Sequence, residues 1–157
     1  MGNIKILISC HKQSIVPDSE IMLPIEVGAD LRSKHIEGYI QDNSGDNISA
    51  KNKMYCELTA QYWAWKNLDA DYYGFFHYRR YLNFSENKYP LDSWQNITEE
   101  RLNDTCLKKY NLNDDCIRNL VETYDIVLSE EKNVAKMPDR NASVSYTHLR
   151  AHETCAD

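Results

Sequence analysis

The chain has 157 residues, of which 42% are hydrophobic and 27% charged, and its formal net charge is −6. These values are typical of one globular domain with its own core, and the negative charge argues against a general nucleic-acid-binding protein. No apolar run approaches the roughly 18–20 residues that a membrane helix needs. The five cysteines are widely spaced without a Cys-x-x-Cys pair, which indicates reduced thiols in a cytoplasmic protein with no integral membrane segment.

The first half of the chain predicts a buried strand, a turn-rich stretch and a helix. The apolar run at residues 4–9 favours a central parallel strand. Residues 10–48 hold the Pro, Gly, Asp and Asn residues of successive turns. A helix is expected to start after Asn52, a good N-cap, and to end near residue 67. Its helical spacing predicts one buried face, made by Met54, Leu58, Tyr62 and Trp65 and broadened by Cys56, Ala60, Trp63 and Ala64.

The second half predicts a strand, two helices and a further strand. Aromatic and β-branched composition favours strands at residues 72–77 and 125–129. Helices are expected from Thr98 to about residue 110, and from residue 113 or 114 to about residue 123. Strands that alternate with helices in this way are typical of an α/β fold with a mostly parallel sheet.

The strand at residues 72–77 ends in a cluster of polar and charged residues, His77-Tyr78-Arg79-Arg80. Ligands of open α/β sheets bind in the crevice beyond the carboxyl ends of the strands. Guanidinium groups at that edge suit an anion such as a pyrophosphate, and Arg79 is the first candidate because it shares a face with His77. As an alternative, the arginines pair with carboxylates such as Asp42 or Asp46 and fix a loop.

Further candidates for the same crevice are Tyr78, as a substrate contact, and the four residues His77, His11, Asp46 and Asn47. His77 is a candidate catalytic base, a donor to phosphate, or a structural histidine at a strand end. His11 follows the first strand and is a candidate for nucleotide or ribose contacts. Asp46 and Asn47 either contact the base, ribose or sugar or simply shape a turn. Glu57, early in the expected helix, is expected to pair with an arginine of the segment that follows His77.

Several other kinds of site lack a motif in this sequence. Asp69-Ala-Asp71 is the one Asp-x-Asp tripeptide, but it precedes its strand and so lies at the edge opposite the crevice. We therefore assign no metal site. The sequence contains no GxxxxGK[ST] or GxGxxG phosphate-binding motif and no G-x-S-x-G nucleophile motif.

The chain contains several long motifs in a fixed order: LISCHK, LPIEVG, GYIQDNSGDNIS, KN-x-x-YCELTAQYWAWKN, DADYYG-x-x-HYRRY and YDIVLSEEKNV. Together they resemble a bacterial glycosyltransferase-like family of capsule and exopolysaccharide gene clusters, many of whose members are described as a domain of unknown function. The resemblance implies a GT-A-like, Rossmann-like α/β fold and sugar transfer from a nucleotide-sugar donor to a glycan or lipid-linked glycan acceptor. It therefore implies a cytoplasmic enzyme, peripheral at the inner membrane face where the acceptor is lipid-linked. Many GT-A enzymes use a divalent metal, for which this chain has no well-placed Asp-x-Asp.

The resemblance covers about the amino-terminal half of the longer family members. We expect residues 1–143 to form the amino-terminal part of a single domain and the truncated chain to be inactive by itself. Residues 144–157 resemble a translated sequencing adapter, and we expect them to be non-native. A different class of function also stays open, in which the chain is a non-catalytic carbohydrate-binding module that uses the aromatic cluster Trp63, Trp65, Tyr78 and Tyr81.

Overall fold

The structure, a computed structural model, describes residues 2–133 and 136–138 and has a four-stranded parallel sheet at its centre. The order of the strands across the sheet is β3-β2-β1-β4, and every neighbouring pair is parallel. The strands are β1 (Ile4–Cys10), β2 (Met22–Glu26), β3 (Ile40–Gln41) and β4 (Tyr72–His77). All four carboxyl ends therefore lie at one edge of the sheet.

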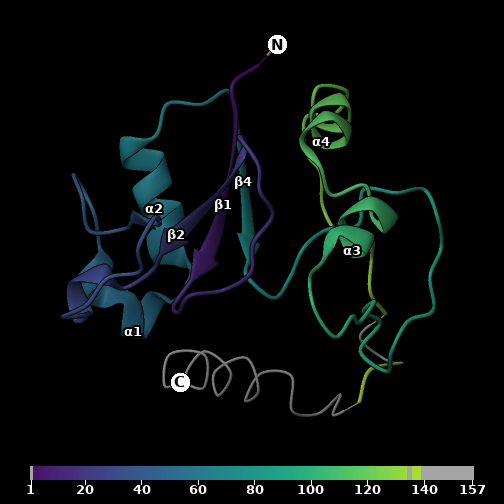
Figure 1. The fold of residues 1–157 in the computed structure, drawn as a ribbon, viewed down its shortest axis with the longest axis horizontal. Helices are drawn as coiled ribbons and strands as arrows, with labels where there is room; N and C mark the ends of the chain where they lie inside the picture. Colours follow the sequence, from purple (N-terminus) through teal and green to yellow (C-terminus); the bar gives the residue numbers. More distant parts are fainter. Residues whose placement is uncertain (1, 134–135, 139–157) are drawn as a thin grey trace.

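Helices flank the sheet on both sides (Figure 1). On one side lie α1 (Asn52–Tyr55) and α2 (Leu58–Asn67), together with the 3-10 helices η1 (Ala29–Leu31) and η2 (Ser49–Lys51). On the other side lie α3 (Asp104–Lys109) and α4 (Asp114–Val121). No helix in the described part of the chain is long and apolar enough to cross a membrane.

The alternation of side chains along β1 builds a core on each face of the sheet. Ile6 and Ile8 face a cluster that includes Phe76 and reaches Ile117 of α4. Leu7 faces the opposite way and packs in a second cluster with residues of β2 and α2. Because both faces of β1 are covered, its near-continuous apolar sequence matches its central place in the sheet.

The predictions for β1 and β4 are confirmed, whereas β2 and β3 were not expected. Pro24 lies within β2, and a proline usually argues against a central strand. Here Pro24 is in register with Ile8 of β1, but only Ile25 and Glu26 pair with β3. Pro24 thus has no partner on the β3 side, which makes a proline tolerable at this point.

The single helix expected from Asn52 is interrupted at Cys56, which has φ 47° and ψ −127°. The buried residues of α2 are Thr59, Ala60, Trp63 and Ala64. The expected centre of the buried face was wrong: Met54 is 79% exposed, Trp65 is 68% exposed and Leu58 is also exposed. The interruption separates the two helical segments, so helical spacing cannot be carried across it, and small residues plus Trp63 form the face that packs on the sheet.

The carboxyl-terminal predictions are partly wrong. The first of the two helices starts at Asp104 instead of Thr98, because the amide oxygen of Asn103 caps it by accepting from the Cys106 N–H at 3.0 Å. The second helix is confirmed, with Asn113 as its N-cap. Residues 125–129 form no strand, and Ile126 and Leu128 are exposed. A sequence that favours a strand is not stable as one unless a neighbouring strand pairs with it through backbone hydrogen bonds.

Candidate functional site

The carboxyl ends of β1 and β4 bring two histidines to one place. Ser9 of β1 is in register with His77, the last residue of β4, and His11 follows β1 directly. His11 and His77 line the same pocket, and both rings contact the Tyr78 ring. The structure therefore joins these two candidates at the edge where the sequence places them.

A pocket opens at this edge, between the strand ends and the junction of α1 with α2. Its lining residues are Ser9, His11, Val27, Arg32, Asn52, Cys56, Glu57 and His77. Cys56 and Glu57 immediately precede α2, so the amino terminus of that helix lies at the pocket. Helix amino termini carry partial positive charge and favour anions.

His77 is largely buried, with 10% of its side chain exposed. The pKa of His77 is lowered to about 4, mainly by burial and also by the positive charges of Arg80 and Arg79, while the Glu57 carboxylate acts in the opposite direction. The ring is therefore neutral at pH 7. The 4.0 Å separation between His77 Nε2 and Glu57 Oε1 is accordingly a contact of a neutral ring with a carboxylate, not an ion pair at that pH.

The free energy of unfolding should fall as the pH drops from about 6.5 toward 4. The unfolded chain takes up a proton on His77 near the ordinary pKa of 6.5, whereas the folded ring stays neutral until about pH 4. Between these values the unfolded state binds more protons, so acid favours unfolding. Urea unfolding at pH 7.5 and pH 5 should show a smaller loss of stability in His77→Gln than in the wild type; equal losses would contradict this.

The chain reverses direction immediately after His77. The His77 carbonyl accepts from the Arg80 N–H at 2.8 Å, and the Arg80 carbonyl accepts from the His77 N–H at 3.3 Å. This turn removes the strict strand alternation, and both Arg79 and Arg80 are exposed beside the pocket. The guanidinium carbon of Arg79 lies 5.0 Å from the centre of the Tyr78 ring.

The alternative pairing of these arginines with Asp42 or Asp46 is not observed in the described residues. Asp42 is fully buried and accepts from the N–H groups of Gly28 at 2.8 Å and Ala29 at 3.0 Å. It also accepts from the Ser49 hydroxyl. This carboxylate therefore fixes the turn after β2 and pairs with neither arginine in the described residues.

Asp46 and Asn47 lie away from the pocket, within their own turn. One Asp46 carboxylate oxygen accepts from the Tyr62 hydroxyl at 3.1 Å, and its carbonyl accepts from the Asn67 side chain at 2.8 Å. Asn67 is the last residue of α2, at the end of the helix remote from the pocket residues Cys56 and Glu57 that precede it. The Asn47 side chain bonds the backbone of residues 43, 45 and 49. The turn-shaping interpretation thus accounts for both.

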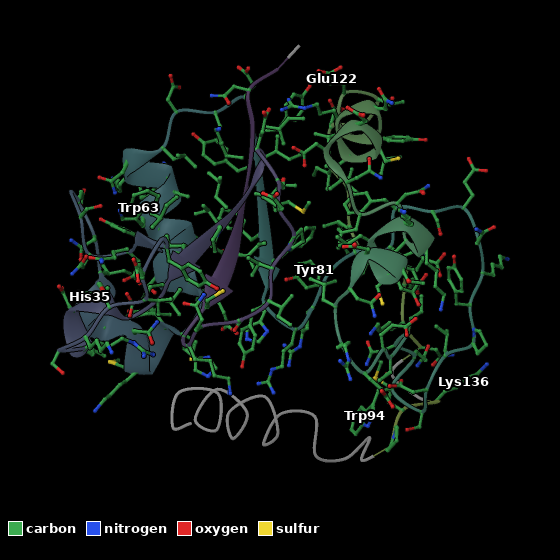
Figure 2. All side chains as sticks on the ribbon, in the orientation of Figure 1. His35, Trp63, Tyr81, Trp94, Glu122 and Lys136 are labelled. Carbon is green, nitrogen blue, oxygen red and sulfur yellow. The ribbon has the colours of Figure 1, made fainter. Side chains whose placement is uncertain are left out.

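The Tyr78 ring packs against the rings of both His11 and His77. Tyr78 is buried, and its ring meets His11 edge-on at 5.2 Å and His77 at 4.3 Å between centroids. Tyr81 lies in the connection between β4 and α3 (Figure 2), and its ring packs against Phe76. Tyr78 thus packs against two residues that line the pocket, while Tyr81 packs in the core cluster with Phe76, and the two rings do not form an open platform.

Asp69 and Asp71 lie at the opposite edge of the sheet, as expected from their place before β4. The Asp71 carboxylate accepts from the Asn3 backbone N–H at 2.7 Å, and the Asp69 carbonyl accepts from the Asn3 side chain at 2.7 Å. Both residues thus tie the chain before β1 to the start of β4. In the part of the chain that the structure describes, no group of three His, Cys, Asp or Glu residues is arranged to hold a metal ion.

Sequence reasoning missed a buried carboxylate and its partners next to the pocket. Glu26 at the end of β2 is fully buried, and its Oε1 lies 3.5 Å from Arg32 Nε. Its other oxygen lies 3.2 Å from His35 Nδ1 and accepts from the Ile36 N–H at 3.2 Å. The signal for this residue was a strand ending in a carboxylate, but Pro24 concealed the strand. Glu26 positions Arg32 in the pocket wall.

Cys56 and Asn52 shape the α1–α2 junction in the pocket wall. Cys56 has a backbone conformation that side-chain-bearing residues rarely adopt. Its carbonyl accepts from the Asn52 side chain at 2.8 Å and from the Thr59 hydroxyl at 3.0 Å. Asn52 in turn packs on Gly28, where a Cβ atom would lie 2.8 Å from the Asn52 Cγ. The junction thus places Glu57 opposite His77.

The fold and the pocket define a glycosyltransferase-like α/β domain. The chain belongs to the family described as Domain of unknown function (DUF4422), whose model matches residues 5–156. It is similar to a solved structure described as the apo structure of the bifunctional glycosyltransferase WbbM, with 43% sequence identity and a TM-score of 0.73. This similarity covers 76% of the chain and 21% of the WbbM chain. No curated protein matches the chain.

These similarities confirm the predicted GT-A-like parallel α/β fold and the resemblance to a glycosyltransferase-like family. The chain spans about a fifth of the solved chain that it matches. The family match includes residues 144–156, and the predicted non-native tail at residues 144–157 stays a prediction. Residues 139–157, with the predicted domain end at residue 143, lie outside the described residues.

Proposed function

We propose that the chain forms the donor-binding part of a glycosyltransferase, which transfers a sugar from a nucleotide-diphosphate donor to a glycan acceptor. The observation that supports this most directly is the arrangement of His11, His77, Arg79 and Arg80 at the carboxyl edge of a parallel sheet. This is the edge where α/β sheets bind nucleotides, and the family is glycosyltransferase-like.

The proposed donor contacts follow from the charge that develops during sugar transfer. When the bond between the anomeric carbon and the phosphate oxygen breaks, the leaving diphosphate gains negative charge that must be stabilised. Arg79 and Arg80 offer permanently charged planar donors in the turn directly after the pocket residue His77, and Arg32 and the amino terminus of α2 add positive potential in the pocket wall. His11 is proposed to contact the nucleotide or its ribose.

The acceptor side of the proposal comes from the family resemblance. We propose that the acceptor is a glycan or lipid-linked glycan of capsule or exopolysaccharide synthesis. An enzyme that modifies such an acceptor works in the cytoplasm, at the inner face of the membrane where the acceptor is lipid-linked. We assign no donor or acceptor contact to Asp46 and Asn47, because their side chains bond within their own turn and with α2.

The carbohydrate-binding module is less well supported. It was expected to use the exposed subset of Trp63, Trp65, Tyr78 and Tyr81, but Trp63 and Tyr78 are buried and only Trp65 is largely exposed. Trp63 packs on the α2 side of the sheet, while Tyr78 and Tyr81 belong to the cluster on the other face. These side chains therefore cannot present one continuous platform to a glycan.

Arg79→Lys should weaken binding of uridine diphosphate about tenfold, equivalent to about 1.4 kcal/mol. Lysine keeps the charge but loses the planar fork that donates two parallel hydrogen bonds to a phosphate. Isothermal titration calorimetry at low salt measures the affinity. Arg101→Lys is the matched control, because Arg101 is exposed and remote in sequence from the pocket residues. Unchanged affinity in Arg79→Lys would mean that Arg79 does not bind the donor. Nucleoside diphosphates other than uridine diphosphate should be tested with the same two variants, Arg79→Lys and Arg101→Lys.

A further inference from the structure

The hydrogen bonding of His77 fixes where the proton of its neutral ring lies. The Arg79 backbone N–H donates to His77 Nδ1 at 3.2 Å. A backbone N–H can only donate, so Nδ1 must hold a lone pair. In the neutral ring the proton is then on Nε2, and Nε2 is the atom that faces Glu57. A ring in this state offers a hydrogen-bond donor to the pocket and has no free lone pair there with which to take a proton.

Glu57 is the carboxylate that faces this donor. It lines the pocket immediately before α2, and 37% of its side chain is exposed, so a substrate can reach it. The expected ion pair of Glu57 with an arginine of the segment after His77 is not observed in the described residues. Glu57 Oε1 instead lies 4.0 Å from Nε2 of the neutral His77 ring. The Glu57 oxygens are therefore not held by a cation of that segment.

The 4.0 Å gap between His77 Nε2 and Glu57 Oε1 matches the space for one hydroxyl group. Two hydrogen bonds of about 2.8 Å that meet at one oxygen at roughly 90° span this distance. A hydroxyl oxygen accepts one hydrogen bond and donates another, which is what Nε2–H on one side and a carboxylate on the other require. A phosphate oxygen can only accept, and it would be repelled by the carboxylate.

We propose that the acceptor hydroxyl binds between these two side chains, with Glu57 as the catalytic base and His77 as a hydrogen-bond donor that holds the hydroxyl oxygen. This inference rests on the proposed function, and it replaces His77 by Glu57 in the role of base. The acceptor O–H bond breaks, and its proton goes to the Glu57 carboxylate. The acceptor oxygen forms a bond with the anomeric carbon of the nucleotide sugar. The bond from that carbon to the phosphate oxygen breaks, and its electron pair leaves with the nucleoside diphosphate.

The neighbouring charges agree with this division of roles. Arg79, Arg80 and His11 all oppose a positive charge on His77, and burial does so most strongly, with a pKa of about 4 as the result. A ring that cannot hold an additional proton at neutral pH is a poor store for the acceptor proton. The permanent positive charges of Arg79 and Arg80 suit the negative charge of the leaving diphosphate.

The first test is nuclear magnetic resonance of the ring nitrogens in the chain labelled with 15N-histidine. At pH 7 the His77 ring should be neutral with its proton on Nε2. The His77 signals are identified by their absence from the spectrum of His77→Gln. Glu57→Gln should lower the midpoint of the His77 titration, because Glu57 raises the His77 pKa. Glu20→Gln is the matched control, since Glu20 is exposed and does not line the pocket. A proton on Nδ1, a charged ring at pH 7, or an unchanged midpoint in Glu57→Gln would overturn the proposal.

The second test separates this proposal from the proposed function. The full-length gene product is given nucleotide sugars, and calorimetry with uridine diphosphate is run beside an assay of nucleoside diphosphate release. Glu57→Gln should keep its affinity for uridine diphosphate within about twofold but lose at least about 100-fold in turnover. Normal turnover in Glu57→Gln would overturn the role of Glu57 while the transferase stands. A wild type that binds no nucleoside diphosphate and releases none would instead reject the transferase itself.

Discussion

Replacing Trp63 with alanine is expected to lower the free energy of unfolding by about 3–5 kcal/mol. Trp63 is the largest side chain in the cluster that joins α2 to Leu7 and Ile25 of the sheet. Its ring nitrogen also donates to the Ser44 carbonyl at 3.0 Å, which attaches the loop after β3 to the helix. The truncation therefore leaves a cavity under α2 and releases that loop.

Trp65→Ala is the matched control, since it removes the same side chain from the exposed face of the same helix. We expect it to change the stability by less than about 0.5 kcal/mol. Urea unfolding followed by far-ultraviolet circular dichroism measures both, because tryptophan fluorescence would change with the substitutions themselves. Equal losses in the two variants would mean that α2 packs through the face that helical spacing predicted, with Trp65 turned inward.

The contrast between these two tryptophans shows where local sequence stops being informative. The apolar composition of residues 52–67 correctly indicates helix, and Trp63 was within the broad apolar band. The centre of the buried face depends on Cys56, where the backbone leaves the helical conformation. That conformation is held by the Asn52 side chain and the Thr59 hydroxyl, and the Asn52 position depends on contact with Gly28. No pattern within the helix segment reports such a contact.

Strand ends were more predictable than strand number. β1 and β4 are apolar runs whose composition indicates strands by itself, and placing polar residues at their carboxyl ends was enough to bring His11 and His77 together. β2 was hidden by Pro24, and β3 is only two residues long. The strand expected at residues 125–129 failed for the opposite reason, because its sequence favours a strand but no neighbour pairs with it in the described residues.

The pocket residues outside the strand ends required the tertiary structure. Glu57 was expected to meet an arginine and instead faces His77, because the α1–α2 junction turns it toward the end of β4. Arg32 reaches the pocket through Glu26, a buried partner that follows a hidden strand. The polar loop residues show the reverse: Asp46 and Asn47 had the right residue types, but bonds within the turn and to α2 occupy them.

Asp42→Ala should be among the most destabilising single changes, with a loss of at least about 3 kcal/mol in the free energy of unfolding. The carboxylate is fully buried and accepts from two backbone N–H groups and the Ser49 hydroxyl. Alanine leaves these buried donors without an acceptor, and each such donor costs about 1–3 kcal/mol. Gly28 and Ala29 lead directly to Arg32, so the same change should also loosen the pocket wall.

Asp46→Ala is the control for this position, since it removes a carboxylate from the same loop at an exposed site. It should cost less than about 1 kcal/mol and leave the affinity for uridine diphosphate unchanged. Urea unfolding measures the stabilities, and calorimetry at a temperature where both variants stay folded measures the affinity. A weaker affinity in Asp42→Ala beside normal affinity in Asp46→Ala would connect the turn after β2 to donor binding. Equal stability losses in the two variants would instead show that the buried hydrogen bonds of Asp42 contribute little to folding, and that the turn holds its shape through the Gly28 and Asn52 packing alone.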